Sequence, residues 1–289
     1  MTKRFNLFTL QYEPHSRKCQ YYTNKISLNG VDMRIIKDMR YIKTNRLSCF
    51  SPPVMIATFG IEIALAFYVT WKYKLNPITR LATAILFFLA LFQLAEYNVC
   101  EGSFGIDSLS WSRLGYVAIT MLPPLGFHLA SRLAGDRRTG LVTSAYVSAG
   151  LFAAFFMFSG AGLTASACLG NYVIFSTAPL ATSLYAAYYY GWLILGTIYC
   201  LVMAARQSQH NRATALRALA LGYLAFIVPT TAVNLINPAT LAGIPSIMCG
   251  FAVLLAIILA GEVLPSYYSQ PTLSSLQQKI AGIYGKISG

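Results

Sequence analysis

The sequence predicts an all-α membrane protein: a bundle of seven transmembrane helices, with its amino end outside and its carboxyl end in the cytoplasm. Seven long apolar runs lie between Pro53 and Pro265, and short polar breaks separate them. A helix of roughly 20 apolar residues crosses the ~30 Å hydrocarbon core of a bilayer. The composition agrees, because 56% of the residues are hydrophobic and only 11% are charged, whereas soluble domains carry about 25% charged residues.

Helices are expected in these runs because a spanning segment must satisfy its own backbone hydrogen bonds. The alternating strands of about ten residues that build a membrane barrel are absent from the sequence. The seven predicted spans, in chain order, are 54–71, 78–100, 114–133, 141–163, 180–205, 216–236 and 244–264.

The breaks between spans alternate in charge, which predicts the orientation. The first, third and fifth breaks carry Lys and Arg, with Asp136 also in the third, whereas the second carries Glu101 and Asp107, with Arg113 at its far end. The fourth and sixth contain no charged residue. Basic loops stay in the cytoplasm, so the odd-numbered breaks are expected there. This distribution accounts for the net charge of +13 better than a nucleic-acid groove does, and no nucleic-acid partner is expected.

The predicted domains are a tail at 1–52, a helical domain at 53–265 and a tail at 266–289. The first tail is basic, and it is interpreted either as an unstructured exterior extension or as sequence upstream of a true start at Met39 or Met55. It has neither a signal-peptide nor a transit-peptide layout. The last tail has apolar residues at three- or four-residue spacing, which fits either an amphipathic helix on the cytoplasmic leaflet or a frayed end.

Ionisable residues inside the spans are the first candidates for function, because they are costly in hydrocarbon. They are Glu62, Glu96, His128 and Glu262. Gln93 precedes Glu96 by three residues and shares its helix face. The alternative interpretation is that these groups are hydrogen-bonded contacts between helices. No Lys falls within a span, which argues against a retinal-type Schiff base.

Prolines and tyrosines suggest two further ligand-binding candidates, Tyr188 and Asn234. Tyr188 belongs to a tyrosine cluster in the fifth span, interpreted either as interfacial anchors or as the lining of an outer pocket. Asn234 lies one turn beyond Pro229 on a polar strip that can equally serve helix packing. Pro123 and Pro124 are expected to interrupt the third span.

Cysteine placement predicts a disulfide but no metal site. Cys100 and Cys168 both fall on the predicted outer side, where oxidising conditions permit a bond between them. No Cys or His has metal-ligand spacing, and no catalytic or phosphate-binding motif is present. We therefore expect no enzyme activity, no cofactor and no metal.

Several short motifs resemble the amino-terminal seven-helix sensor region of bacterial histidine kinases and related signalling proteins. The residues that carry the resemblance are Asn76-Pro-Ile-Thr-Arg80, Leu122-Pro-Pro-Leu125, Gly135-Asp-Arg-Arg138 and Arg212-Ala-Thr-Ala-Leu-Arg217, the last leading to Pro229 and Asn234. The tryptophan often seen in that family's second helix is absent, and no kinase output domain follows. The resemblance implies sensing of a ligand or a membrane state in the bacterial inner membrane, with a partner protein carrying the signal.

Two functional hypotheses follow from these features. The first is an integral membrane protein of sensor or receptor type, without catalytic output, whose partners are the lipid bilayer and a small-molecule ligand or a signalling protein. The second is a small transporter or a membrane-embedded enzyme that uses Glu62, Glu96 and His128. A structural subunit of a larger complex is a third interpretation.

Overall fold

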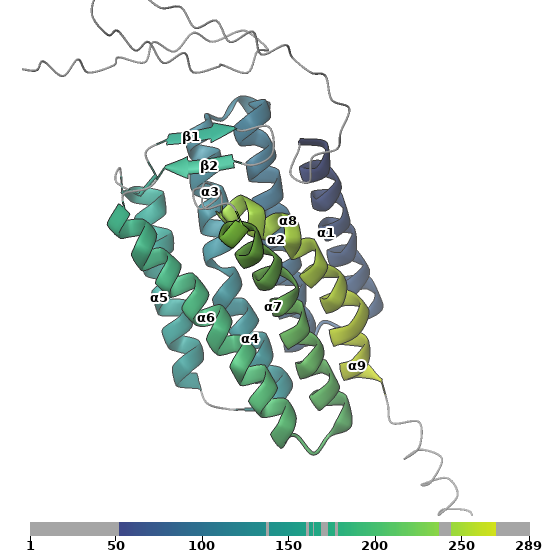
Figure 1. Ribbon diagram of the computed structural model, residues 1–289. Coiled ribbons are helices and arrows are strands. Elements are labelled where there is room, and N and C mark those ends of the chain that lie inside the picture. The colour runs from purple at the N-terminus through teal and green to yellow at the C-terminus, as the bar shows by residue number, and fades with distance from the viewer. Residues whose placement is uncertain are drawn as a thin grey trace, which may run out of the picture. The chain divides into compact units, whose positions relative to one another are not determined.

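The computed structural model describes residues 52–136, 139–159, 162–163, 165–168, 173–176, 179–236 and 244–269, all within one compact unit. The predictions for the two tails, including a helix after Ser269, lie outside these residues. Figure 1 shows the helices of this unit running side by side.

The helices follow the apolar runs of the sequence. Within the described residues, seven helical segments are long and apolar enough to cross a membrane, as predicted. The helices are α1 (Pro52–Lys72), α2 (Pro77–Glu101), α3 (Ser108–Thr120), α4 (Leu122–Ala134), α5 (Thr139–Phe158), α6 (Pro179–Arg206), α7 (His210–Ile236), α8 (Ile244–Ile258) and α9 (Leu264–Tyr268). A 3₁₀ turn, η1 (Ser103–Gly105), precedes α3, and a π-helical turn, η3 (Leu259–Val263), joins α8 to α9.

Several boundaries differ from the prediction for local reasons. The third span begins at Ser108 rather than near 114, because the Asp107 side chain caps the helix and accepts a hydrogen bond from the Ser110 amide at 2.9 Å. The seventh continues past Pro265, because this proline lies in the first turn of α9, where its missing N–H is tolerated. The fourth ends at Phe158 rather than near 163.

A short β-hairpin adds two strands to the expected all-helical fold. Strands β1 (Ala165–Cys168) and β2 (Val173–Ser176) pair antiparallel in the break between α5 and α6, with Ala165 opposite Ser176. The hairpin lies beside α2 and α3, at the end of the unit opposite α9 (Figure 1). Sequence analysis missed it because four-residue strands in an uncharged break give no length or charge signal.

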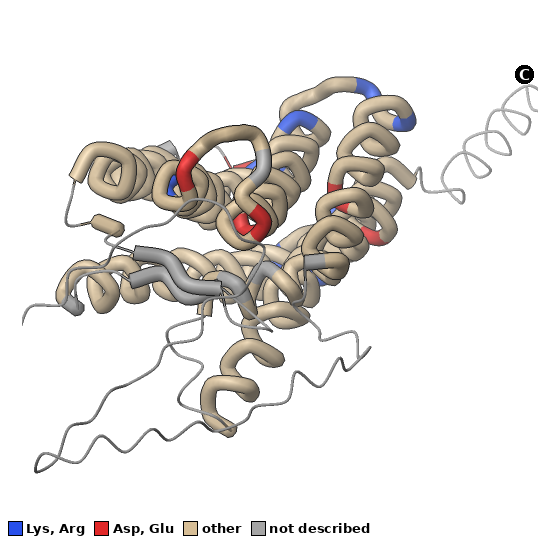
Figure 2. The backbone as a smooth tube through the Cα atoms, turned by 90° about the horizontal axis from the view of Figure 1, so that it is seen from above, with Lys and Arg blue, Asp and Glu red and all other residues tan. Residues whose placement is uncertain are grey.

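The odd-numbered breaks gather at one end of the unit, here called the basic end: the loops that join α1 to α2, α4 to α5 and α6 to α7. Tyr199 donates a hydrogen bond to Asp136 Oδ2 at 3.0 Å, and Gln207 donates one to the Ala134 carbonyl at 3.1 Å. Figure 2 shows how few charged residues the described helices carry. The alternation of charge in the sequence thus becomes a separation of charge in space.

The α1–α2 loop and α9 meet at the same end. Asn76, which caps α2, also donates a hydrogen bond to the Tyr268 hydroxyl. Tyr268 stacks on Tyr73 with ring centroids 4.9 Å apart. Asn211, in the first turn of α7, donates to the carbonyl of Ser269. The end of α9 is therefore held by both neighbouring loops.

The adjacent prolines of the third span cause only a one-residue break. Pro123 and Pro124 fall in the first turn of α4, and Met121 alone separates it from α3. The Met121 amide still donates to the Ala118 carbonyl at 3.2 Å, so the helical path continues. Pro229 lies inside α7, which runs through it without a break.

Candidate functional site

The structure distributes the predicted ligand-binding residues over four places. Glu62, Gln93 and Glu96 lie on the facing helices α1 and α2. The other three belong to different surroundings: His128 on α4, Tyr188 on α6 and Asn234 near the end of α7. Asn234 is half-buried. The fold therefore does not bring all six residues into one pocket.

Glu62 and Glu96 form a buried carboxyl pair. Glu62 has no exposed surface, and the exposed fractions of Glu96 and Gln93 are 1% and 2%. Within the described part of the chain, neither carboxylate oxygen of Glu62 has a hydrogen-bond partner. Leaving a buried polar group unsatisfied is costly. Thr83, Asn98, Trp111 and Arg113 each have one such atom, whereas Glu62 has two.

Helix direction explains how these two residues approach each other. Helices α1 and α2 are consecutive, antiparallel and closely packed. Side chains lean toward the amino end of their own helix, so Glu62 leans toward the hairpin end while Glu96 leans away from it. The two carboxyl groups lie within electrostatic range of each other, and Glu96 lies within range of the Tyr116 hydroxyl on α3.

His128 belongs to a different polar contact between α4 and α5. Its Nδ1 atom lies 3.2 Å from the Tyr146 hydroxyl, and its Nε2 atom accepts a hydrogen bond from Arg132 Nε at 3.2 Å. With Nε2 acting as an acceptor, Nδ1 carries the proton and donates to Tyr146. The contacts of His128 therefore involve its own helix and α5, not the carboxyl pair.

Tyr188 satisfies a backbone carbonyl that the proline pair leaves open. Its hydroxyl donates to the Thr120 carbonyl at 2.7 Å, and Pro124, four residues later, has no N–H to offer this carbonyl. The Thr120 hydroxyl in turn lies 3.0 Å from the Tyr185 hydroxyl. Tyr185, Tyr188 and Tyr189 are each at most 8% exposed, so they are core residues and the interpretation as interfacial anchors does not hold for them.

An apolar cavity lies between the helices, and sequence analysis did not find it. It encloses about 20 Å³ of space open to a water-sized sphere, about the room of one water molecule, so a larger occupant has to spread the surrounding helices. The lining residues are Ile85, Leu89, Leu122, Gly126, Tyr189, Leu193, Leu219, Tyr223, Phe226, Met248, Ala252, Leu255 and Leu259. Apolar side chains give no sequence signal that separates a cavity wall from a filled core.

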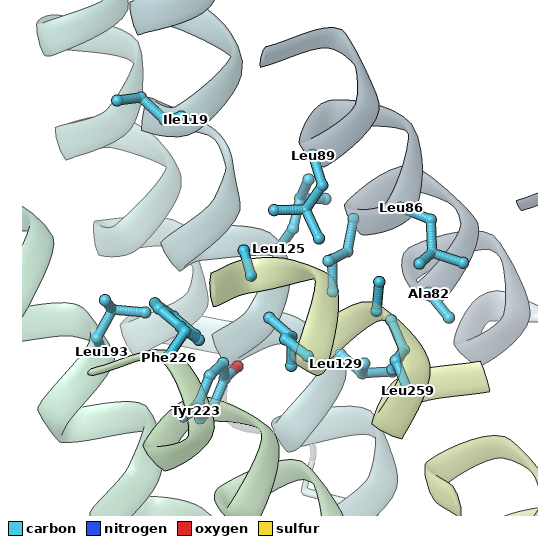
Figure 3. Close-up of a cluster of buried hydrophobic side chains, with 14 of the residues drawn as sticks. Ala82, Leu86, Leu89, Ile119, Leu125, Leu129, Leu193, Tyr223, Phe226 and Leu259 are labelled. Carbon is cyan, nitrogen blue, oxygen red and sulfur yellow. The ribbon is translucent and has the colours of Figure 1, made fainter. Parts of the chain in front are cut away.

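Tyr223 is the most distinctive residue of this cavity. It is 4% exposed, and its side chain lines the cavity together with that of Tyr189. Figure 3 shows this hydroxyl among the apolar side chains of the core, with Phe226 and Leu193 nearby. Gly126 leaves room for it, because a Cβ atom there would lie 2.2 Å from the hydroxyl oxygen.

The predicted disulfide cysteines and Glu262 are the remaining candidates, and Cys100 and Glu262 lie near the ends of helices. Cys100 takes part in a disulfide bond. The side chain of its predicted partner, Cys168, lies outside the described residues, so the pairing stays a prediction, although β1 packs beside α2. Glu262 lies exposed in η3. No group of three metal-ligating side chains occurs among residues 52–269 where the structure describes them.

No family model and no characterised protein sequence matches this chain.

Proposed function

We propose that this chain is a multi-pass membrane protein of sensor or receptor type that binds an apolar small molecule in the cavity between α2, α4, α6, α7 and α8. The observation that carries the proposal is the buried Tyr223 side chain, which brings a hydroxyl to a largely apolar cavity. Apolar walls with a small number of polar groups are typical of sites for mostly hydrophobic ligands, and the hydroxyl-bearing residues here are Tyr189 and Tyr223. The ligand class proposed is a lipid-like molecule with a hydrogen-bonding group, whose entry widens the cavity by moving the surrounding helices.

The resemblance to seven-helix sensor regions supports the sensor interpretation over a solely structural role. The cavity walls come from helices that are well separated in the sequence, so an occupant contacts α2, α4, α6, α7 and α8 at once. A ligand shifts an equilibrium only by binding one arrangement of helices better than another. A ligand bound in this cavity would therefore change how the helices pack. A partner protein that contacts the helices would respond to the new packing.

We propose further that the basic end faces the cytoplasm of a bacterial inner membrane. Two independent features support this orientation. The loops at that end carry the basic residues, as cytoplasmic loops do. Cys100, whose thiol is oxidised to a disulfide, ends α2 at the opposite end, and disulfides persist in oxidising compartments.

The ligand proposal is tested by measuring binding of oleic acid to the full chain in lipid nanodiscs. Oleic acid is expected to raise the thermal unfolding midpoint of the wild-type chain. Ala252→Phe fills the cavity and is expected to abolish this rise. Tyr223→Phe keeps the ring but removes the hydroxyl, so it is expected to weaken binding by roughly two- to tenfold, the value of one hydrogen bond.

Tyr97→Phe is the matched control, because Tyr97 is a half-buried tyrosine that does not line the cavity. Mass spectrometry of lipids that copurify with the chain supplies a second measurement. Equal copurification with wild type and Ala252→Phe would contradict a ligand in this cavity. A flux of the ligand across reconstituted vesicles would favour the transporter hypothesis instead.

A further inference from the structure

We propose that Glu62 and Glu96 form a site for a monovalent cation, H⁺ or Na⁺, between α1 and α2. This site is separate from the apolar cavity, because neither carboxyl group lines that cavity. Two observations carry the inference: Glu62 is fully buried with both carboxylate oxygens unpartnered, and the two helices aim a second buried carboxyl group toward it.

The surroundings of Glu62 offer no protein cation. On α1 itself, Thr58 lies one turn before Glu62, but its hydroxyl is bonded to the carbonyls of Val54 and Met55 at 3.0 and 2.9 Å. Helix α8, which also packs on α1, has no Asp, Glu, Lys, Arg or His between Ile244 and Ile258. The negative charge of Glu62 is thus not balanced from its own helix or from α8.

Helix α2 brings further negative charge rather than a counter-ion. The groups that face Glu62 from this side are the Glu96 carboxyl and, behind it on α3, the Tyr116 hydroxyl. A buried carboxylate whose oxygens have no hydrogen-bond partner, as in Glu62, is expensive in a low-dielectric interior, and a second carboxyl group nearby adds to that cost. A bound cation removes that cost.

The number of ligands favours a monovalent cation. A divalent metal site usually draws on three or more protein side chains, and no such group of His, Cys, Asp and Glu occurs in the described part of the chain. A proton shared by two carboxyl groups needs no further ligand, and Na⁺ can complete its shell with carbonyl, amide or water oxygens. Gln93, one turn before Glu96 and almost fully buried, places an amide on the same face of α2.

The test uses the full chain in lipid nanodiscs, with NaCl exchanged for KCl at constant ionic strength and at several pH values. If Na⁺ is the occupant, the unfolding midpoint rises with Na⁺ but not with K⁺. If H⁺ is the occupant, the midpoint rises as the pH falls and Na⁺ has no specific effect. Either response supports the site and identifies the cation.

Glu62→Gln should remove the rise in the unfolding midpoint, or raise the cation concentration that gives half of it by at least about tenfold. Tenfold is the lower limit of the affinity loss seen when groups around a metal are removed. Glu262→Gln is the matched control, because this exposed carboxyl group lies in η3, and it should respond like wild type. Infrared spectroscopy and ²²Na⁺ binding on the wild-type chain give a direct readout that does not depend on folding of a variant. A wild-type chain with neither a buried protonated-carboxyl band nor bound Na⁺ would overturn the proposal, as would an unchanged response in Glu62→Gln.

Discussion

The Tyr188 hydroxyl on α6 donates a hydrogen bond of 2.7 Å to the Thr120 carbonyl at the last residue of α3. In an uninterrupted helix, that carbonyl would receive the amide of residue 124, which here is a proline without N–H. The side chain of a remote helix thus replaces the missing donor. This contact lets two adjacent prolines lie inside a long apolar segment without leaving a buried carbonyl unsatisfied.

Tyr188→Phe is expected to destabilise the chain by about 1–3 kcal/mol, the cost of an unsatisfied buried polar group. The measurement is the unfolding free energy in a fixed detergent. Tyr190→Phe serves as the control, because Tyr190 lies two residues away and packs on the same core. Adding Pro124→Ala to Tyr188→Phe restores an amide near the Thr120 carbonyl, so the double variant should recover part of the loss. Additive losses would contradict this account.

Gly126→Ala is expected to destabilise the protein by about 1–3 kcal/mol through overpacking. The added Cβ atom would lie 2.2 Å from the Tyr223 hydroxyl oxygen and 3.1 Å from the ring carbon that bears it. Tyr223→Phe removes the nearer atom and should relieve part of this loss. Gly191→Ala on α6 meets nothing within 4 Å, and it should be neutral or slightly stabilising. Equal effects at the two glycines would show that close packing at Gly126 is not the cause.

Asp107 should make the stability of α3 depend on pH. Hydrogen bonds from the hydroxyl and the amide of Ser110 lower the pKa of its carboxyl group below the ordinary value of 3.8. Because the folded-state pKa lies below the unfolded one, this stabilisation is present above the unfolded pKa and is lost as the pH falls through the folded pKa. Unfolding midpoints measured below about pH 5 report this loss.

Two variants separate the charge of Asp107 from its capping role. Asp107→Asn keeps a side-chain acceptor, so it should preserve most of the stability and flatten this acidic pH dependence. Asp107→Ala removes the cap and should cost about 0.5–2 kcal/mol at neutral pH. An unaltered pH profile in Asp107→Asn would assign the acid sensitivity to another group.

The orientation proposed above predicts which single cysteines react with a membrane-impermeant maleimide in intact cells. Phe104→Cys, in the exposed turn before α3, should be labelled from outside. Lys74→Cys and Gln209→Cys, in the first and fifth breaks, should be labelled only after the membrane is opened. Labelling of Lys74→Cys and Phe104→Cys from the same side would contradict the arrangement.

The sequence predicted the coarse fold well because hydropathy and charge are sums over short segments. The seven apolar runs correspond to seven helical segments, and the alternation of basic breaks corresponds to one basic end of the fold. Hydropathy did not locate the start of α3, because the polar cap at Asp107 lies outside the apolar run.

Contacts that depend on the rotation of each helix were beyond the reach of sequence reasoning. Tyr188 was predicted to bind a ligand or to anchor an interface, yet its hydroxyl bonds to the Thr120 carbonyl; a ligand role for Tyr188 stays a prediction. The cavity around Tyr223 went unnoticed because its walls come from five helices and η3, and no one of them looks unusual. A periodic apolar segment shows that a face is buried but not what it meets.

The sequence by itself determined that this is a chain of membrane-length apolar helices with basic residues at alternate connections, because both properties are local and add along the chain. Only the tertiary structure decided which buried polar groups are satisfied, which face one another and where space remains between helices. Those outcomes depend on the depth and rotation of helices distant in the sequence. For this reason the unpartnered oxygens of Glu62 and the hydroxyl of Tyr223 became visible as candidate sites only after the helices were packed together.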